Sequence, residues 1–257
     1  MSVALKNALG GVWTNAEVAA LYRYRPAYPE PVFGILRGLM SGSSTILDVG
    51  CGTGALARRM TSFAARVDAV DRSEAMIAEG KRLPGGDDRR IRWLVGTAET
   101  APLEGPYGLI TTGQSLHWMD HDVVMPRFHD ALAERARLAA PDIDWDFPPE
   151  WREELVAIIR TYSPTRSTFS VDLFGDLQRR GLFERQGFRK TTDERVDMPI
   201  DDFVRMQQST SSLATVTLKE RSDTFAADVR RLFARRGLDR VSFAVAAGVV
   251  WGRPLRP

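Results

Sequence analysis

Between residues 46 and 112 the chain alternates short apolar runs with longer stretches in which apolar residues recur at helical spacing. The apolar runs predict four buried strands, and the longer stretches predict two amphipathic helices, the second with Ser73 as its N-cap. The predicted strands cover 46–50, 66–71, 91–96 and 107–112, and the helices cover 55–64 and 73–83. Strands that alternate with helices in this way predict an α/β fold, a doubly wound parallel sheet with helices on both faces.

The second half of the chain follows this pattern less regularly. The predicted helices cover 126–137, 171–181, 201–209 and 218–236, and the predicted strands cover 188–198 and 240–252. Because helices precede the final strand, residues 199–238 are expected to form a cap insertion and not a separate domain. The aromatic and proline-rich stretch 146–170 is expected to form another cap insertion.

Composition narrows the range of partners. The 257 residues are 44% apolar and 26% charged, with a formal net charge of only +2, so nothing favours nucleic acid or an acidic membrane as a partner. The single cysteine, Cys51, excludes an intrachain disulfide and fits a reducing cytoplasm. The first residues do not read as a signal peptide, and the longest apolar run, 243–251, is too short to span a membrane.

A glycine-rich turn follows the first predicted strand. Gly50, Gly52 and Gly54 have the spacing G-x-G-x-G, and Asp71 ends the second strand seventeen residues later. Such glycines let the backbone approach a ligand, and an acid at this place can accept hydrogen bonds from both hydroxyls of a ribose. Loop and acid together predict a site for an adenosine-containing cofactor. A dinucleotide remains an alternative, because Ala55 stands where some dinucleotide sites have their third glycine.

The longer string ILDVGCGTG (46–54) closely resembles motif I of the class I S-adenosylmethionine-dependent methyltransferases. The stretches 66–77 and 95–99 resemble that family's next motifs, and 20–31 and 107–120 resemble its trans-aconitate-type small-molecule subgroup. The resemblance implies a Rossmann-like, mostly parallel sheet with an antiparallel C-terminal strand and helical cap insertions. It also implies S-adenosylmethionine as cofactor and S-adenosylhomocysteine as product.

This resemblance implies a single methyltransferase domain over residues 1–257. Its expected parts are N-terminal lid helices at 1–40, a cofactor-binding core at 41–145, the cap insertions at 146–170 and 199–238, and the final strand at 239–257. The cofactor-binding residues that it implies are Tyr22, Arg25, Asp48, Gly50, Cys51, Gly52, Gly54, Asp71, Arg72, Met76, Thr97, Ala98, Glu99, Gln114, Ser115 and His117.

The chain departs from the family pattern at two places. Thr97 stands where the family commonly has an aspartate that contacts the adenine, and either the threonine or the Ala98 backbone could substitute for that contact. The glycine pair expected before the fifth strand is missing, and Pro141 removes a backbone donor there. We expect a distorted, shortened or bulged fifth strand.

All three histidines of the chain, His117, His121 and His129, lie between residues 113 and 129. His117 follows the fourth strand, where it can act as a general base or form part of the pocket wall. A metal site is not expected, because Asp120 reads as a helix N-cap that leaves His117 outside the helix, and Pro126 breaks the register before His129. The other two histidines are expected to face water.

The sequence defines the residues that would bind the methyl acceptor less well. Tyr28, Trp118, Trp145 and Trp151 are expected to line a substrate pocket, with packing in the core as the alternative for each. The leading hypothesis is a cytoplasmic enzyme, monomer or homodimer, that methylates a small molecule such as a carboxylate or a secondary metabolite. The alternatives are a protein of this fold that binds the cofactor without methyl transfer, in a cyclase-like or regulatory role, and an NAD-dependent dehydrogenase.

Overall fold

The computed structural model describes residues 11–163 and 172–256. It consists of two compact units, each built from three segments of the chain. Among the described residues, the sheet unit comprises 27–144, 172–192 and 246–256, and the helical unit comprises 11–26, 145–163 and 193–245. Most of the expected N-terminal lid, and every described residue of both expected cap insertions, falls in the helical unit.

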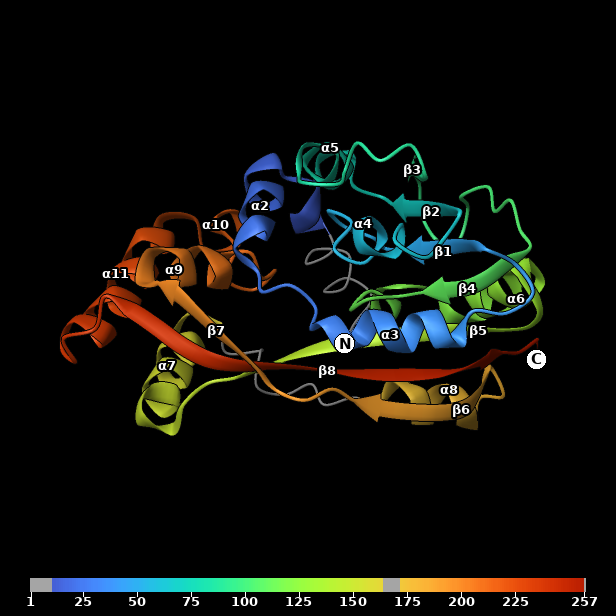
Figure 1. The fold of residues 1–257 in the computed structure, drawn as a ribbon. Helices are drawn as coiled ribbons and strands as arrows, with labels where there is room; N and C mark the ends of the chain where they lie inside the picture. Colours follow the sequence, from blue (N-terminus) through green and yellow to red (C-terminus); the bar gives the residue numbers. More distant parts are fainter. Residues whose placement is uncertain (1–10, 164–171, 257) are drawn as a thin grey trace. The chain divides into compact units, whose positions relative to one another are not determined.

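The sheet has the order β3-β2-β1-β4-β5-β8-β6, and β7 also pairs with β8 (Figure 1). Strands β1 to β5 are joined by parallel pairings, whereas β6 and β7 pair with β8 in antiparallel fashion. The strands are β1 (Thr45–Val49), β2 (Arg66–Asp71), β3 (Ile91–Val95), β4 (Tyr107–Thr111), β5 (Leu132–Asp146), β6 (Phe183–Lys190), β7 (Glu194–Pro199) and β8 (Arg240–Pro254). This architecture confirms the predicted Rossmann-like fold class.

Apolar side chains of the central strands alternate between two cores, one on each face of the sheet. In β1, Leu47 packs in the core that contains α6 (His121–Ala131) and α8 (Leu173–Arg179). Its neighbour Ile46 packs in the opposite core, with α3 (Glu30–Leu39) and α4 (Ala57–Met60). Since successive residues of a strand point to opposite faces, both faces of the sheet unit are covered by helices.

The helical unit is held together by aromatic side chains. Besides β7 and the first residues of β8 it contains the helices η1 (Gly11–Thr14), α2 (Ala16–Leu21), η2 (Tyr22–Tyr24), α7 (Pro149–Tyr162), α9 (Ile200–Gln208), α10 (Thr215–Leu218), η5 (Lys219–Arg221) and α11 (Ser222–Ala234). The ring of Phe203 on α9 packs edge-on against Trp151 and Phe233, with centroids 5.8 and 5.7 Å apart. Contacts of this kind add to the stabilisation that comes from apolar burial alone.

The fifth strand is longer than expected. β5 spans 15 residues, so the expectation of a shortened strand was wrong, while the expected bulge is confirmed by a register shift against β4. Arg135 lies within this irregularity and has a φ of +63°. The register with β4 ends at Ala139. Beyond it, the Pro141 carbonyl accepts a hydrogen bond from the Gln114 N–H at 3.3 Å.

Four other elements differ from the prediction. The predicted helix 126–137 ends at Ala131, because the next residues belong to β5, and Pro126 lies inside α6 without breaking it. The predicted strand 188–198 is divided between β6 and β7. The helix predicted at 55–64 is confined to α4, and residue 171, the predicted start of α8, lies outside the described residues.

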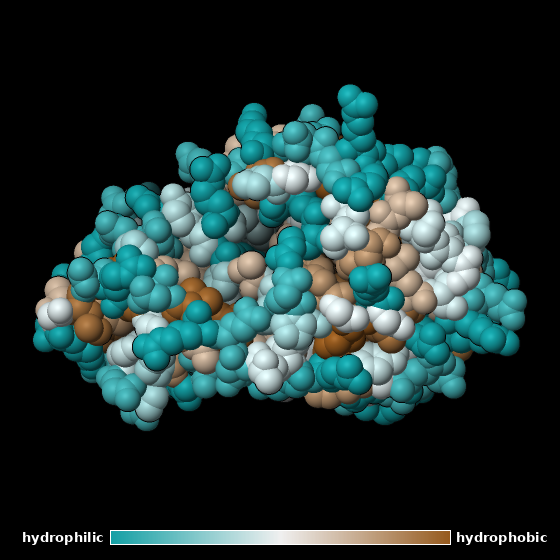
Figure 2. Space-filling view, viewed as in Figure 1, coloured by the Kyte–Doolittle hydropathy of each residue, from teal (hydrophilic) through white to brown (hydrophobic). Residues whose placement is uncertain are grey.

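The surface is mixed in character. Hydrophobic areas in Figure 2 are separated by hydrophilic side chains, and the exposed large hydrophobic residues lie on different elements of the chain. Among the described residues no helix is long and apolar enough to cross a membrane.

Candidate functional site

The glycine loop connects β1 to α4 in the left-handed backbone region. Gly50, Gly52 and Gly54 have φ values of +66°, +55° and +75°, which disfavour other residues. A Cβ on Gly50 would come within 2.4 Å of the Ser115 Cβ, and one on Gly54 within 2.4 Å of the Trp93 ring. The loop is also fixed to β2, since the N–H groups of Gly50 and Cys51 donate to the Val70 carbonyl at 2.8 and 3.0 Å. Glycine is therefore required here by both conformation and space.

Asp71 closes this loop from the end of β2. Its Oδ2 accepts the Gly52 N–H at 2.8 Å, and its Oδ1 accepts the Ser73 N–H at 2.8 Å. Burial raises the pKa of Asp71, against the lowering effect of these two hydrogen bonds. A carboxylate has about four acceptor positions, so two remain for the hydroxyls of a ribose.

Asp48, on β1, is buried directly before the glycine loop. Its Oδ1 accepts the Thr111 hydroxyl at 2.8 Å, whereas its buried Oδ2 has no hydrogen-bond partner. Burial raises the pKa of Asp48 from 3.8 to about 7, against the lowering effects of the Thr111 hydroxyl and the Ala57 backbone N–H. Thr112, which follows β4, also has a buried hydroxyl without a partner. Unpaired buried polar atoms are costly in a folded protein, and here two of them stand at the carboxyl ends of neighbouring strands.

The residues after β3 hold one another in place. The hydroxyls of Thr97 and Thr100 lie 3.0 Å apart, and the Ala98 carbonyl accepts the Arg127 Nε at 3.2 Å. Glu99 accepts the Asp120 N–H at 3.0 Å. Burial acts to raise the pKa of Glu99, but its hydrogen bonds and the nearby Arg72 outweigh burial and lower it. Glu99 thereby links the end of β3 to the start of α6.

Two further predicted cofactor residues follow β4, and the side chain of each is hydrogen-bonded to another residue of the protein. Ser115 donates its hydroxyl to the Val49 carbonyl at 2.6 Å. Gln114 has a φ of +52°, and its side-chain nitrogen lies 3.0 Å from Asp142 Oδ1. Few non-glycine residues adopt this left-handed backbone conformation, and those that do are often found at functional sites. Asp142 itself was not predicted, and no sequence motif marks it.

The three histidines have separate environments. His117 is exposed on η3 (Leu116–Trp118), with its ring 5.0 Å from that of Trp118. The Nε2 of His121 lies 3.0 Å from the Leu116 carbonyl, so this residue, expected to face water, is half-buried. His129 lies beside Asp130 at 3.2 Å. Asp120 is the N-cap of α6 as predicted, and the described residues contain no group of three or more potential metal ligands.

The remaining predicted site residues are divided between the two units. In the helical unit, Arg25 donates to the side chain and the carbonyl of Ser209, both at 2.8 Å, and lies over the Tyr22 ring. Trp151 is buried in the aromatic cluster, and the buried Trp145 indole N–H has no partner. In the sheet unit, Cys51 and Met76 are buried, Arg72 is exposed, and the Tyr28 hydroxyl lies 2.8 Å from where a Gly113 Cβ would be. Burial raises the pKa of the Cys51 thiol.

A glycine loop closed by an acid at the carboxyl edge of a doubly wound sheet defines a nucleoside-cofactor site. Comparison with known proteins identifies the class more closely: residues 46–142 match the family described as methyltransferase domain. The matched residues contain the glycine loop and Asp71, so this part of the chain is similar to a methyltransferase domain. A search of curated proteins gave no significant match.

Solved structures agree with this fold. The chain is 24% identical to a provisionally assigned type II methyltransferase from Anaeromyxobacter dehalogenans, with a TM-score of 0.64 over 89% of this chain and 97% of that one. It is 16% identical to the YcgJ protein from Bacillus subtilis, with a TM-score of 0.53 over 88% of this chain and 100% of the other. A provisionally assigned methyltransferase from Bacillus halodurans gives 17% identity and a TM-score of 0.50, over 88% and 98% of the two chains. At these identities the likeness concerns the fold alone.

Proposed function

We propose that the protein transfers the methyl group of S-adenosylmethionine to a small molecule, such as a carboxylate or a secondary metabolite. The observation that carries the proposal is the glycine loop, closed onto the Asp71 carboxylate and placed beside two unpaired buried oxygens, Asp48 Oδ2 and Thr112 Oγ1. The near-neutral charge of the chain supports a small acceptor over nucleic acid.

The residues present fit this cofactor. Asp71 would receive the ribose hydroxyls with its free acceptor positions, and the glycine loop would lie against the rest of the nucleoside. Asp48 Oδ2 and Thr112 would receive polar atoms of the methionine part, and a cationic ammonium group suits a buried carboxyl group that has no positive partner. The bound cofactor supplies an activated methyl group, so the protein has mainly to orient the acceptor.

His117 is the proposed general base for acceptors that must lose a proton. Its exposed imidazole follows β4, at the edge of the sheet where ligands of such folds bind. Tyr28 and Trp118 are proposed to line the acceptor pocket. We further propose a cytoplasmic location. We also propose a monomeric or homodimeric state, and light scattering on the purified protein will measure this oligomeric state.

Thermal unfolding in the presence of ligands tests the cofactor. A ligand that binds only the folded state raises Tm by an amount that grows with its concentration relative to Kd. We expect S-adenosylhomocysteine to raise Tm and NADH to leave it unchanged. A shift with NADH alone would contradict the proposed cofactor.

Labelled S-adenosylmethionine, incubated with the protein and an extract of small metabolites, tests methyl transfer. We expect label in a small product only when the protein is present. Cofactor binding without any labelled product from acceptor-containing extracts would favour the non-transferring alternative.

The variant His117→Ala tests the proposed base. We expect a loss of turnover of about 100-fold, typical for removal of a general base, with little change in S-adenosylhomocysteine affinity. His129→Ala, which changes a histidine beside Asp130, is the matched control and should retain the wild-type rate. A wild-type rate in His117→Ala would rule out the assignment.

A further inference from the structure

The loop that follows β4 is held to the end of β5, where the chain departs from the family pattern. The Thr112 N–H donates to the Ala139 carbonyl at 3.1 Å, and the Gln114 N–H donates to the Pro141 carbonyl at 3.3 Å. Gln114 has a φ of +52°, which a residue with a side chain seldom adopts. Such a conformation persists where the surroundings hold it, so these contacts fix the place of Gln114 at the carboxyl ends of the two strands.

The partners of the Gln114 side chain fix the orientation of its carboxamide group. Its Nε2 lies 3.0 Å from Asp142 Oδ1 and 3.4 Å from the Ile143 carbonyl oxygen. A carboxylate and a carbonyl only accept hydrogen bonds, so the atom that faces them must be the nitrogen. Gln114 Oε1 and Asp142 Oδ2 remain as acceptors, and neither makes a hydrogen bond within residues 11–163 and 172–256. Both residues are exposed, so these two oxygens can receive donors from a ligand.

The strand order relates these two oxygens to the proposed cofactor site. Asp71, the proposed ribose contact, ends β2, and the sheet continues from there in the order β1, β4, β5. Thr112, proposed to contact the methionine part, is 1% exposed with an unpartnered hydroxyl, and it precedes Gln114 by two residues. A methyl acceptor must lie on the far side of the methyl carbon from the sulfur. The ends of β4 and β5 are therefore the part of this sheet edge that is left for the acceptor.

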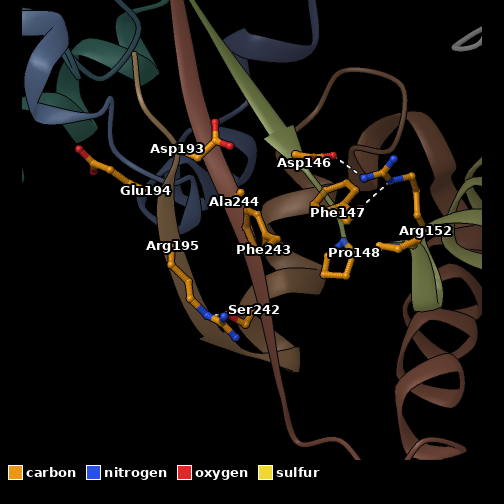
Figure 3. A pocket seen from close by; sticks show the side chains of 11 residues that line it. Asp146, Phe147, Pro148, Arg152, Asp193, Glu194, Arg195, Ser242, Phe243 and Ala244 are labelled. Atoms are coloured by element: carbon orange, nitrogen blue, oxygen red, sulfur yellow. Dashed lines mark hydrogen bonds and ion pairs between the residues drawn. The ribbon is translucent and has the colours of Figure 1, made fainter. Parts of the chain in front are cut away.

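The charges at these strand ends favour a cationic group. Residues 111–118 and 139–145 contain no lysine or arginine. The last aspartate of β5, Asp146, is neutralised by an ion pair with Arg152 in a pocket of about 370 Å³ within the helical unit (Figure 3). Asp142, in contrast, makes no ion pair within the described part of the chain. A carboxylate bound beside Asp142 would be repelled, whereas an ammonium group would be attracted.

We propose that the methyl acceptor is a primary amine, and that Gln114 Oε1 and Asp142 Oδ2 bind its nitrogen. Asp142 is in addition a positioning residue, because it orients the Gln114 carboxamide. The inference rests on the proposed function and narrows the small molecule named there to an amine in place of a carboxylate. It also assigns Gln114 to the acceptor, although the family resemblance implies a cofactor contact.

Two acceptor oxygens suit the form in which a primary amine reacts. The bound ammonium group first releases a proton to the proposed base, His117. The neutral amine then has two N–H donors, one for Gln114 Oε1 and one for Asp142 Oδ2, and its lone pair is free. That lone pair forms the bond to the methyl carbon as the carbon–sulfur bond breaks and its electron pair stays on sulfur. The products are the N-methylammonium form of the acceptor and S-adenosylhomocysteine.

The chemical form of the labelled product tests the acceptor class. The full chain is incubated with methyl-labelled S-adenosylmethionine and an extract of small metabolites, either untreated or with its amines acylated by N-hydroxysuccinimidyl acetate. Hydroxylamine then restores any acylated thiols and hydroxyls. We expect an alkali-stable labelled product from the untreated extract and little label after acylation.

Undiminished label from the acylated extract, or label that alkali releases as methanol, would overturn the inference. No label from any extract would contradict methyl transfer itself, and the inference would fall with it.

Variants of Asp142 test its role through the extract concentration that gives half the maximal rate of labelling. Asp142→Ala should raise this concentration about tenfold and Asp142→Asn about threefold, since asparagine keeps an acceptor for Gln114 but loses the charge. Asp144→Ala removes another exposed carboxylate of β5 and is the matched control. The affinity for S-adenosylhomocysteine should stay at its wild-type value in all three variants, which a general disturbance of the loop would not allow.

Asp142 is exposed, so its variants are expected to fold, and circular dichroism will verify this. A wild-type value in folded Asp142→Ala, or an equal loss in Asp144→Ala, would overturn the assignment. Gln114→Leu should also raise the half-saturating concentration about tenfold. The double variant should lose less than the product of the two single losses, because Asp142 acts partly through Gln114. A loss equal to that product would remove the positioning role.

Discussion

Asp48 and Asp68 are both fully buried, on neighbouring parallel strands, and yet their surroundings differ. Both oxygens of Asp68 accept from the Arg92 guanidinium, at 3.0 and 2.9 Å, and its Oδ2 also accepts the Tyr107 hydroxyl at 2.7 Å. Asp48 has one short hydrogen bond, from Thr111, and an oxygen without a partner. The Asp68 carboxylate is therefore fully paired within the fold, whereas the Asp48 carboxyl group keeps one oxygen without a partner.

The difference follows from position along the strands. In the register of β1 and β2, Leu47 lies beside Asp68, so Asp48 is one residue nearer the carboxyl edge and the glycine loop. A buried carboxylate with a full set of partners stabilises the fold, and removal of any partner is costly. A buried carboxyl group that is left partly unpaired makes the folded protein less stable but can bind a ligand. Each variant below alters either the paired Asp68 network or the unpaired groups around Asp48.

The largest effect is expected for Asp68→Ala. This change leaves Arg92 and Tyr107 without a buried acceptor and Arg66 without its ion-pair partner, which should lower the free energy of unfolding by about 3–5 kcal/mol. Urea denaturation measures it. Glu104→Ala, which removes an exposed partner of the same Arg92, should cost less than about 1 kcal/mol. Equal costs for the two variants would show that the buried network has no special role.

Asp48→Asn is expected to have the next largest effect, with the opposite sign. The pKa of Asp48 in the folded protein, about 7, lies above its ordinary 3.8, so the folded state binds the extra proton between these values. Stability from this group is therefore present below about pH 4 and is lost as the pH rises toward 7. The asparagine variant should gain up to about 4 kcal/mol over the wild type at pH 8 and little at pH 4.

The same variant separates stability from binding. If Asp48 receives the ammonium group of the cofactor, Asp48→Asn should bind S-adenosylhomocysteine about tenfold more weakly at pH 8, although the protein is more stable. Unfolding curves at both pH values and calorimetric titration give the two quantities. An unchanged affinity together with a higher stability would remove Asp48 from the cofactor site.

Tyr107→Phe should cost about 1–3 kcal/mol, because Asp68 loses a hydrogen bond and the Glu104 N–H loses its acceptor. The affinity for S-adenosylhomocysteine should stay at its wild-type value, since this network does not include the glycine loop. A variant that loses affinity but not stability would contradict the division drawn between the two aspartates.

Thr112→Val is expected to have the smallest effect on stability. It replaces a buried, unpartnered hydroxyl by a methyl group of the same shape, so the free energy of unfolding should rise by no more than about 1 kcal/mol. The affinity for S-adenosylhomocysteine should fall if the hydroxyl serves the cofactor. A large loss of stability would instead show that the hydroxyl has a partner in solution.

The comparison also shows what a sequence can predict. Strands β1 to β4, the glycine loop and the Ser73 cap were all predicted, because each depends on neighbouring residues and on local periodicity. Pro126 appeared to interrupt a helix, yet α6 continues through it and ends only where β5 begins. The residues that donate hydrogen bonds to Asp68, Arg92 and Tyr107, lie on β3 and β4, so no local pattern could reveal that this aspartate would be fully paired and Asp48 would not.

The final strand has a consequence for the way the chain folds during synthesis. Residues 240–245 of β8 belong to the helical unit and residues 246–254 to the sheet unit, and β8 is the neighbour of β5 in the sheet. When β5 leaves the ribosome, about a hundred residues must still be translated before β8 can pair with it, a delay of several seconds at ordinary rates of synthesis. During that time β5 has an open edge, which is a site for incorrect pairing or chaperone binding. The nascent chain thus needs most protection along β5.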